Sequence, residues 1–311
     1  MRTKNFYELT AKDVASAGGK GASLGEMTQV KIPVPPGFVV LAPTFDEFLH
    51  ATDLTQEVAA QFDKVNYQDV ASVEYASAAI HGLITEAQVP KEIEDEIFAG
   101  FDALGAEFVA VRSSATAEDS SAASWAGELE SYLNTTRERL IENVKKCWAS
   151  LFTPRAIVYR HEQDLHGTHV SVAVVVQKMV QSEVAGITFT VHPVTKDQNQ
   201  MIIEACWGLG ELIVGGRVTP DAYVVDKRDG TLIDVNVSEQ DKMLARSPSG
   251  NALVDVPQEK RAAQKLADAK ISELAEICKT IETHYAFPCD IEWALENDKF
   301  YIVQSRPITT L

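Results

Sequence analysis

Cysteine is scarce in this sequence, and none of it has the spacing of a metal site. The chain has four cysteines in 311 residues, and no two of them form a Cys-x-x-Cys pair. Isolated thiols of this kind are typical of reduced, mostly buried cysteines in a cytosolic protein. The sequence therefore argues against zinc binding through Cys147, Cys206, Cys278 and Cys289.

Long hydrophobic runs are also missing. A helix that spans a bilayer needs ~18 or more apolar residues, whereas the most apolar stretch here, Val170–Val176, has the length of a strand. The first residues, Met1–Thr10, lack the apolar run of a signal peptide. We therefore expect a cytoplasmic protein without a membrane partner.

Positive charge is in short supply. Lys and Arg number 28 against 45 Asp and Glu, which gives a net charge of -17. Because such a chain repels polyanions, we expect no nucleic acid as a partner. An anionic ligand would have to be held by a local cluster of cations. The length of 311 residues allows one large domain or two lobes.

The strongest positive signal lies near the end of the sequence. Asp290–Leu295 and Phe300–Ser305 read as two strands joined by a turn at Asn297 and Asp298. Side chains alternate across a strand, so the centre of the loop decides which residues share a face. If the loop centres on Asp298, one face carries Glu292, Gln304 and Arg306, and the other carries Ile291, Trp293, Leu295, Tyr301, Val303 and Ser305.

The polar face of this hairpin predicts a metal–phosphate clamp. Glu292 and Gln304 supply the oxygen ligands that Mg²⁺ prefers, and Arg306 would hold a phosphate through two hydrogen bonds. Two alternatives stay open. The hairpin could be an ordinary amphipathic one with a polar outer face, and a loop centre half a residue away would separate Glu292 from Gln304.

Helical and strand patterns alternate along the rest of the chain, which predicts a mixed α/β fold that is strand-rich in its last third. The hydrophobic periodicity predicts a broken helix over Thr10–Met27, several helices between about 44 and 104, and helices over Thr135–Phe152, after Pro154 and over Gln258–His284. Strands are expected at Phe38–Leu41 and Phe108–Val111, and as two pairs, His169–Val180 with Val184–Val191 and Met201–Ala205 with Ala222–Asp226.

Three upstream segments carry further candidate site residues. Lys20 lies in the glycine-rich stretch Gly18–Gly25, which either cradles phosphate or forms a tight turn between two helical pieces; it is not a Walker A loop. Arg112 directly follows a buried strand, and it is either a site residue or the exposed end of that strand. Gln177 lies where a strand ends, either at an adenine or in solvent. For His161, His166 and His169 we expect surface or structural roles.

Taken in order, these segments resemble the nucleotide-binding domain shared by phosphoenolpyruvate synthase, pyruvate phosphate dikinase and rifampin phosphotransferase. The resemblance covers Gly18 to Thr309 and implies an α/β (α+β) fold of the ATP-grasp type, in which two lobes clasp Mg-ATP. We expect these lobes at residues 1–190 and 191–311. The matching stretches are Gly-Gly-Lys-Gly-Ala-Ser-Leu-Gly, Val-Pro-Pro-Gly-Phe, Val-Arg-Ser-Ser-Ala-Thr-Ala-Glu-Asp, Ala-Gly-x-x-x-Ser-Tyr-Leu-Asn, Gln-Lys-Met-Val, Trp-Gly-Leu-Gly-Glu and Gln-Ser-Arg-Pro-Ile-Thr.

The resemblance also implies a role for each matching residue. The implied catalytic residues are Lys20, Arg112 and Arg306, all of which would contact the phosphates. Glu292 and Gln304 are the implied ligands of Mg²⁺. The implied nucleotide contacts are Lys20, Arg112, Gly127, Ser131, Gln177, Glu292, Gln304 and Arg306, where Gly127 and Ser131 belong to a loop that closes over the phosphates and Gln177 lies at the adenine.

The function that the resemblance implies is that of an ATP-dependent phosphotransferase. In that family ATP phosphorylates a histidine on a separate swivelling domain, which carries the group to an acceptor domain. The sequence contains neither of these, so we expect a phosphoenolpyruvate synthase-type domain that passes phosphate towards pyruvate with both partner domains in cis or in trans. The alternatives are a rifampin phosphotransferase domain and a stand-alone ATP-sensing module. His192 departs from the family, which more often has Asn or Asp there.

Overall fold

The chain folds into two compact units. The computed structural model describes residues 1–116, 130–163, 171–247 and 250–309. The first unit is formed by Met1–Glu26 and Pro36–Met179, and the second by Met27–Pro35 and Val180–Leu311. Both units combine helices with antiparallel sheets, which confirms the expected mixed α/β class. The expected lobe boundary at residue 190 stays a prediction; the compact units divide earlier, between Met179 and Val180.

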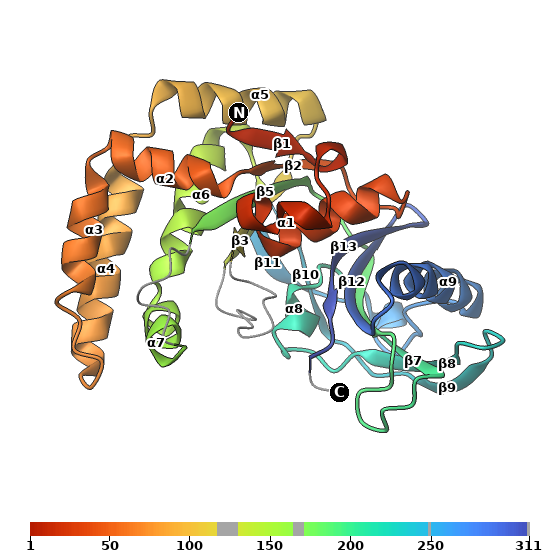
Figure 1. The fold of residues 1–311 in the computed structure, drawn as a ribbon. Coiled ribbons are helices and arrows are strands. Elements are labelled where there is room, and N and C mark those ends of the chain that lie inside the picture. The colour runs from red at the N-terminus through yellow and green to blue at the C-terminus, as the bar shows by residue number, and fades with distance from the viewer. Residues whose placement is uncertain (117–129, 164–170, 248–249, 310–311) are drawn as a thin grey trace. The chain divides into compact units, whose positions relative to one another are not determined.

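A five-stranded antiparallel sheet forms the centre of the first unit (Figure 1). Its middle strand is almost entirely Val and Ala, which favour a strand that is buried on both faces. In spatial order the strands are β1 (Thr3–Asn5), β2 (Gly37–Val40), β5 (Val172–Lys178), β3 (Val109–Ala115) and β4 (Ser131–Thr135).

Helices cover both faces of this sheet. On one face Val111, Val174 and Val176 share a hydrophobic core with residues of six helices. Helix α1 (Val14–Gln29) packs on the opposite face, because a Cβ atom added to Gly21 would lie only 3.0 Å from the side chain of Val39. The helices of the first face are α2 (Ala42–Ala51), α3 (Leu54–Phe62), α4 (Val70–Glu86), α5 (Lys91–Leu104), α6 (Leu140–Ala149) and α7 (Pro154–Glu162).

The second unit is built on a six-stranded antiparallel sheet. One face is covered by α9 (Asp268–Tyr285), whose Leu274, Cys278 and Ile281 are buried. A short helix, α8 (Glu211–Val214), and a hairpin of β10 (Lys242–Ser247) and β11 (Gly250–Asp255) complete the unit. In spatial order the sheet strands are β13 (Lys299–Pro307), β12 (Cys289–Glu296), β6 (Val184–Phe189), β7 (Gln200–Trp207), β8 (Asp221–Asp226) and β9 (Leu232–Asn236).

Several sequence-based expectations about elements are wrong. The strands near His169–Val180 and Val184–Val191 do not pair, because β5 lies in the sheet of the first unit and β6 in that of the second. The helix expected from Gln258 begins only at Asp268. The residues before it turn inward instead, where Lys265 is fully buried against Asp221. The pairing of Met201–Ala205 with Ala222–Asp226 is confirmed.

None of the helices within the described ranges has both the length and the apolar composition to cross a membrane. The longest, α9, carries charged residues along its exposed side, such as Lys270, Glu273 and Glu276.

Candidate active site

The hairpin at the end of the second unit brings Glu292 directly opposite Gln304. The turn between its strands consists of Asn297 and Asp298, with φ angles of 50° and 62°. Two consecutive positive φ values define the type I′ turn that favours two-residue hairpins. The loop therefore centres between these two residues, not on Asp298 as assumed from the sequence.

A β-bulge restores the pairing that this turn alone would have lost. Near the turn Trp293 pairs with Ile302, but the next pair is Glu292 with Gln304, so that Val303 has no partner across the ladder. One extra residue in a strand shifts the register by one and reverses which side chains face which way. Glu292 and Gln304 thus share a face because of the bulge.

The two-residue turn changes the composition of the buried face between the turn and the bulge. Ile291, Trp293 and Leu295 were expected beside Tyr301 and Val303, but the register pairs Trp293 with Ile302 and Leu295 with Phe300. Ile302 and Phe300 are buried, and the ring of Phe300 packs edge-on against Trp293 at 5.6 Å. Of the three residues expected here from the second strand, Tyr301, Val303 and Ser305, only Ser305 lies on this face, opposite Ile291.

Asp290 joins the polar face of the hairpin, although the sequence reasoning missed it. It pairs with Arg306 across the ladder and forms an ion pair with it, Oδ2 lying 2.7 Å from Nη2 and 2.8 Å from Nε. Its second oxygen, Oδ1, is buried and has no hydrogen-bond partner in the described part of the chain. Burial raises the pKa of Asp290, while Arg306 acts in the opposite direction. The signal was available, since Asp290 is two residues from Glu292 on a strand.

A further carboxylate lies on this face of the sheet. Glu204 is in register with Ile187, which in turn is in register with Glu292, so Glu204 faces the same side two strands away. Burial raises the pKa of Glu204, and the negative charge of Asp290 adds to the effect. The face away from α9 is therefore acidic and carries one guanidinium at its edge.

In the first unit, the predicted site residues share the sheet face that α1 meets. Arg112 pairs with Ser131 on β4 and with Val175 on β5, and Gln177 lies two residues further along β5. Arg112 and Gln177 are 8% and 2% exposed, so their side chains are held within the fold instead of ending in solvent.

Lys20 is carried by α1, which the glycine-rich stretch interrupts. Gly18 has a φ of 68° and is not helical, and the helix resumes after it. The segment is thus a break between two helical pieces, and the phosphate-binding role of Lys20 stays a prediction. The backbone N–H groups of Lys20 and Gly21 donate to the hydroxyl of Ser114 on β3, at 3.1 and 3.4 Å.

The sequence matches the family described as pyruvate phosphate dikinase, AMP/ATP-binding domain, over residues 14–311. The chain belongs to this family. It is 45% identical over 98% of its length to probable phosphoenolpyruvate synthases of Methanothermobacter thermautotrophicus and Archaeoglobus fulgidus, where the matched regions are 46% and 41% of those proteins. It is 37% identical over 98% of its length to the rifampicin phosphotransferase of Bacillus subtilis, matching 36% of that protein. The chain spans less than half the length of these relatives.

Membership of the pyruvate phosphate dikinase AMP/ATP-binding domain family identifies the chain as a nucleotide-binding domain. Among the described residues, no three His, Cys, Asp or Glu side chains gather as a dedicated metal cage would require. Mg²⁺ typically uses one or two protein oxygens and takes the rest from phosphate and water. The paired oxygens of Glu292 and Gln304, next to the unpartnered Oδ1 of Asp290, fit such an ion.

The remaining predicted residues of this family member fall elsewhere. Gly127, His166 and His169 lie outside the described residues. His161 stacks on Tyr67 with ring centroids 3.7 Å apart, which is a structural role. His192 accepts hydrogen bonds at Nδ1 from the backbone N–H groups of Val194 and Thr195, at 3.2 and 3.3 Å. Its imidazole thus caps a turn, as an Asn or Asp side chain would.

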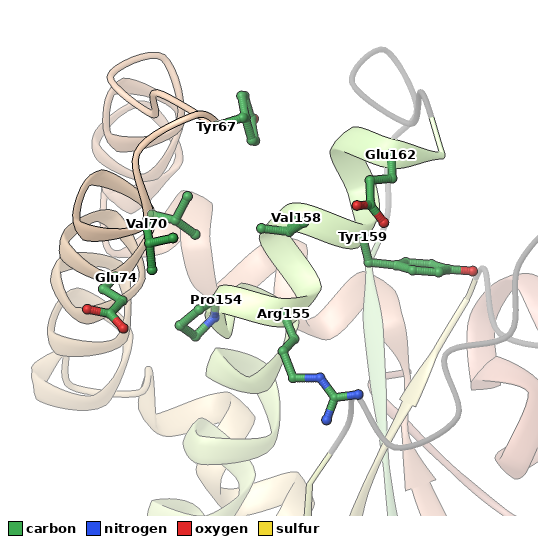
Figure 2. Close-up of a pocket in the computed structure, with 9 residues that line it drawn as sticks. Tyr67, Val70, Glu74, Pro154, Arg155, Val158, Tyr159 and Glu162 are labelled. Carbon is green, nitrogen blue, oxygen red and sulfur yellow. The ribbon is translucent and has the colours of Figure 1, made fainter.

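A groove of about 370 Å³ in the first unit contains none of the predicted site residues (Figure 2). It lies between the start of α4 and the helix α7, with apolar side chains facing it from both sides and charged residues at the rim. Its lining consists of Tyr67, Val70, Val73, Glu74, Pro154, Arg155, Val158, Tyr159 and Glu162. We assign no part of the nucleotide site to it.

Proposed function

We propose that this chain binds Mg-ATP and prepares it for phosphoryl transfer, as the nucleotide-binding domain of a phosphoenolpyruvate synthase-type enzyme. The observation that carries the proposal is the hairpin face on which Glu292 pairs with Gln304 while Asp290 holds Arg306 at 2.7 Å. An acid, an amide and a guanidinium on one strand pair match the needs of a metal-bound polyphosphate.

Glu292 and Gln304 would hold Mg²⁺, which when bound neutralises phosphate charge. Arg306 would bind the phosphate chain, and Asp290 keeps its guanidinium in place. Lys20 and Arg112 supply two further cations, and Gln177 contacts the adenine. Three cations and a divalent metal match the roughly four negative charges of ATP, and each charge-assisted contact contributes ~1.5–3 kcal/mol.

The chemistry expected of such a site is positioning and charge stabilisation. Phosphoryl transfer needs the acceptor in line with the leaving group and cations around the transferred oxygens. This chain's residues supply the cations. The nucleophile we propose is a histidine on a swivelling domain, to which the β-phosphoryl group passes while AMP and phosphate leave. The group then reaches pyruvate on a third domain. The greater length of the relatives leaves room for both domains.

The direct test mixes this chain with the histidine domain of a related synthase and with ATP labelled at the β or the γ phosphate. We expect label from the β position on the histidine, with AMP and phosphate released as the histidine is phosphorylated. Tight ATP binding without any labelled histidine would favour the ATP-sensing alternative.

A second candidate function is supported by the similarity to the rifampicin phosphotransferase of Bacillus subtilis, at 37% identity. Supplying rifampicin in place of pyruvate, with the matching acceptor domain, separates the two. Pyruvate is favoured because the synthases match at higher identity, up to 45%.

A further inference from the structure

The helix that carries Lys20 restarts at a glycine and therefore begins with unsatisfied backbone groups. The first N–H groups of an α-helix have no partner within the helix and are usually satisfied by a side chain just before it. Here Gly18, with its φ of 68°, precedes the restart and has no side chain to offer. Its conformation is one that glycine adopts without strain.

Ser114 supplies the missing cap from a distant part of the sequence. Its Oγ accepts from the N–H of Lys20 at 3.1 Å and from that of Gly21 at 3.4 Å. Serine is among the residues that cap helices best, and here it does so from strand β3. The backbone N–H groups of Lys20 and Gly21 are thus hydrogen-bonded to the central sheet of the first unit.

The contact between the two segments is close and buried. Ser114 is 0% exposed. A Cβ added to Gly18 would lie 2.2 Å from the hydroxyl of Ser114 and 2.5 Å from its carbonyl oxygen, so no larger residue fits without displacement. The glycine-rich stretch therefore serves close packing on β3, and two of its N–H groups are already bonded to protein.

Ser114 also follows Arg112 by two residues on the same strand, so both side chains point to the same face. A single strand thereby carries one phosphate-binding cation and holds the segment that carries the other. We propose that Ser114 is a positioning residue: it fixes Lys20 relative to Arg112, so that both cations meet the phosphates of the nucleotide. This inference rests on the proposed function, since it requires both cations to bind phosphate.

The test compares Ser114→Ala with Ser150→Ala in nucleotide titrations. Ser150 is also 0% exposed in the first unit, and its hydroxyl donates to the carbonyl of Cys147 at 2.7 Å, away from the glycine-rich stretch. Loss of the cap should weaken ATP binding roughly five- to tenfold, while adenosine, which has no phosphate, should bind within about twofold of wild type. Ser150→Ala should leave both affinities unchanged.

A double-mutant cycle with Lys20→Met separates positioning from a general loss of stability. If Ser114 acts through Lys20, adding Ser114→Ala to Lys20→Met should change ATP affinity by less than about twofold. Independent, multiplying effects would overturn the inference, and so would equal losses for ATP and adenosine. Should Ser114→Ala fail to fold, Ser114→Cys keeps a side chain of similar shape with a weaker acceptor and should still give an ATP-specific loss.

The two proposals fail in different ways. If Lys20→Met and Arg112→Ala themselves leave ATP affinity unchanged, the proposed function is wrong at these residues. If both weaken ATP binding but Ser114→Ala does not, only the positioning role of Ser114 is wrong.

Discussion

The charged residues of the hairpin face interact electrostatically with one another in the absence of a ligand. Asp290 neutralises Arg306 at 2.7 Å, and Glu204 lies close enough for its pKa to be raised by the charge of Asp290. Bringing a polyphosphate to this acidic face would be unfavourable without a cation, because carboxylates and phosphates repel each other. If the proposed function is right, nucleotide binding at this face should therefore depend on a metal.

This dependence gives the first prediction, for Glu292→Gln. Removing the negative charge of Glu292, one of the two proposed Mg²⁺ ligands, should leave ATP affinity far less sensitive to Mg²⁺. The ratio between the affinities measured with Mg²⁺ and with EDTA should become smaller. Calorimetry at both conditions measures that ratio. Glu276→Gln, which removes an exposed carboxylate from α9, serves as the control. A ratio that matches the wild type would remove Glu292 from the metal shell.

A second prediction concerns a buried ion pair that has no part in the site. Asp221 and Lys265 are both 0% exposed and 2.7 Å apart, and Tyr223 donates to the same carboxylate at 2.7 Å. Asp221→Asn would leave the ammonium group buried without a counter-charge, which typically costs ~3–5 kcal/mol. Urea unfolding should show this loss. Asp255→Asn breaks the exposed pair with Lys242 and should have little effect; similar losses in the two variants would contradict the argument.

At the scale of elements, the hairpin shows what a sequence can and cannot predict. The alternation of residues placed the strands correctly, since those depend on local pattern, whereas Glu292 and Gln304 share a face only because of the bulge. The bulge at Val303 was not predictable, because one unpaired residue leaves no mark in the pattern. Likewise, the start of α9 at Asp268 depends on Asp221, the distant partner of Lys265. The cap of α1 depends on the distant Ser114. Contacts between residues far apart in sequence decide these features.

The packing of α4 against α6 leads to a prediction on pH. His81 on α4 has its Nε2 buried without a hydrogen-bond partner among the described residues. Burial lowers the pKa of His81, although a hydrogen bond with Ala149 acts the other way. The unfolded chain therefore binds this proton more readily than the folded one. Stability should be full above the ordinary histidine pKa of about 6.5 and should fall as the pH drops through and below it.

The measurement compares melting temperatures of wild type and His81→Leu between about pH 7.5 and 5.5, a window that brackets the ordinary histidine pKa. The substitution should remove part of the acid-induced decrease, because leucine fills the site without titrating. A decrease of the same size in both proteins would assign the acid sensitivity to other groups.

At the scale of the whole molecule, the predicted phosphate ligands are divided between the two units. Lys20 and Arg112 belong to the first, whereas Arg306 belongs to the second. The proposed function requires all three cations to act on one nucleotide, since a net charge of -17 offers no general attraction for ATP. The requirement predicts one ATP per chain, and an affinity that depends on cations from both units.

Arg112→Ala and Arg306→Ala test this last point. Each variant should keep its fold, as judged by circular dichroism, and weaken ATP binding by about ten- to a hundredfold, the effect of one lost charge-assisted contact. Stoichiometry should stay at one in the wild type, and each variant should lower the affinity of that single binding event. A second, unaffected binding event in either variant would mean that the units bind nucleotides separately. Arg112 as a whole is 8% exposed, so loss of fold in Arg112→Ala would instead assign it a structural role.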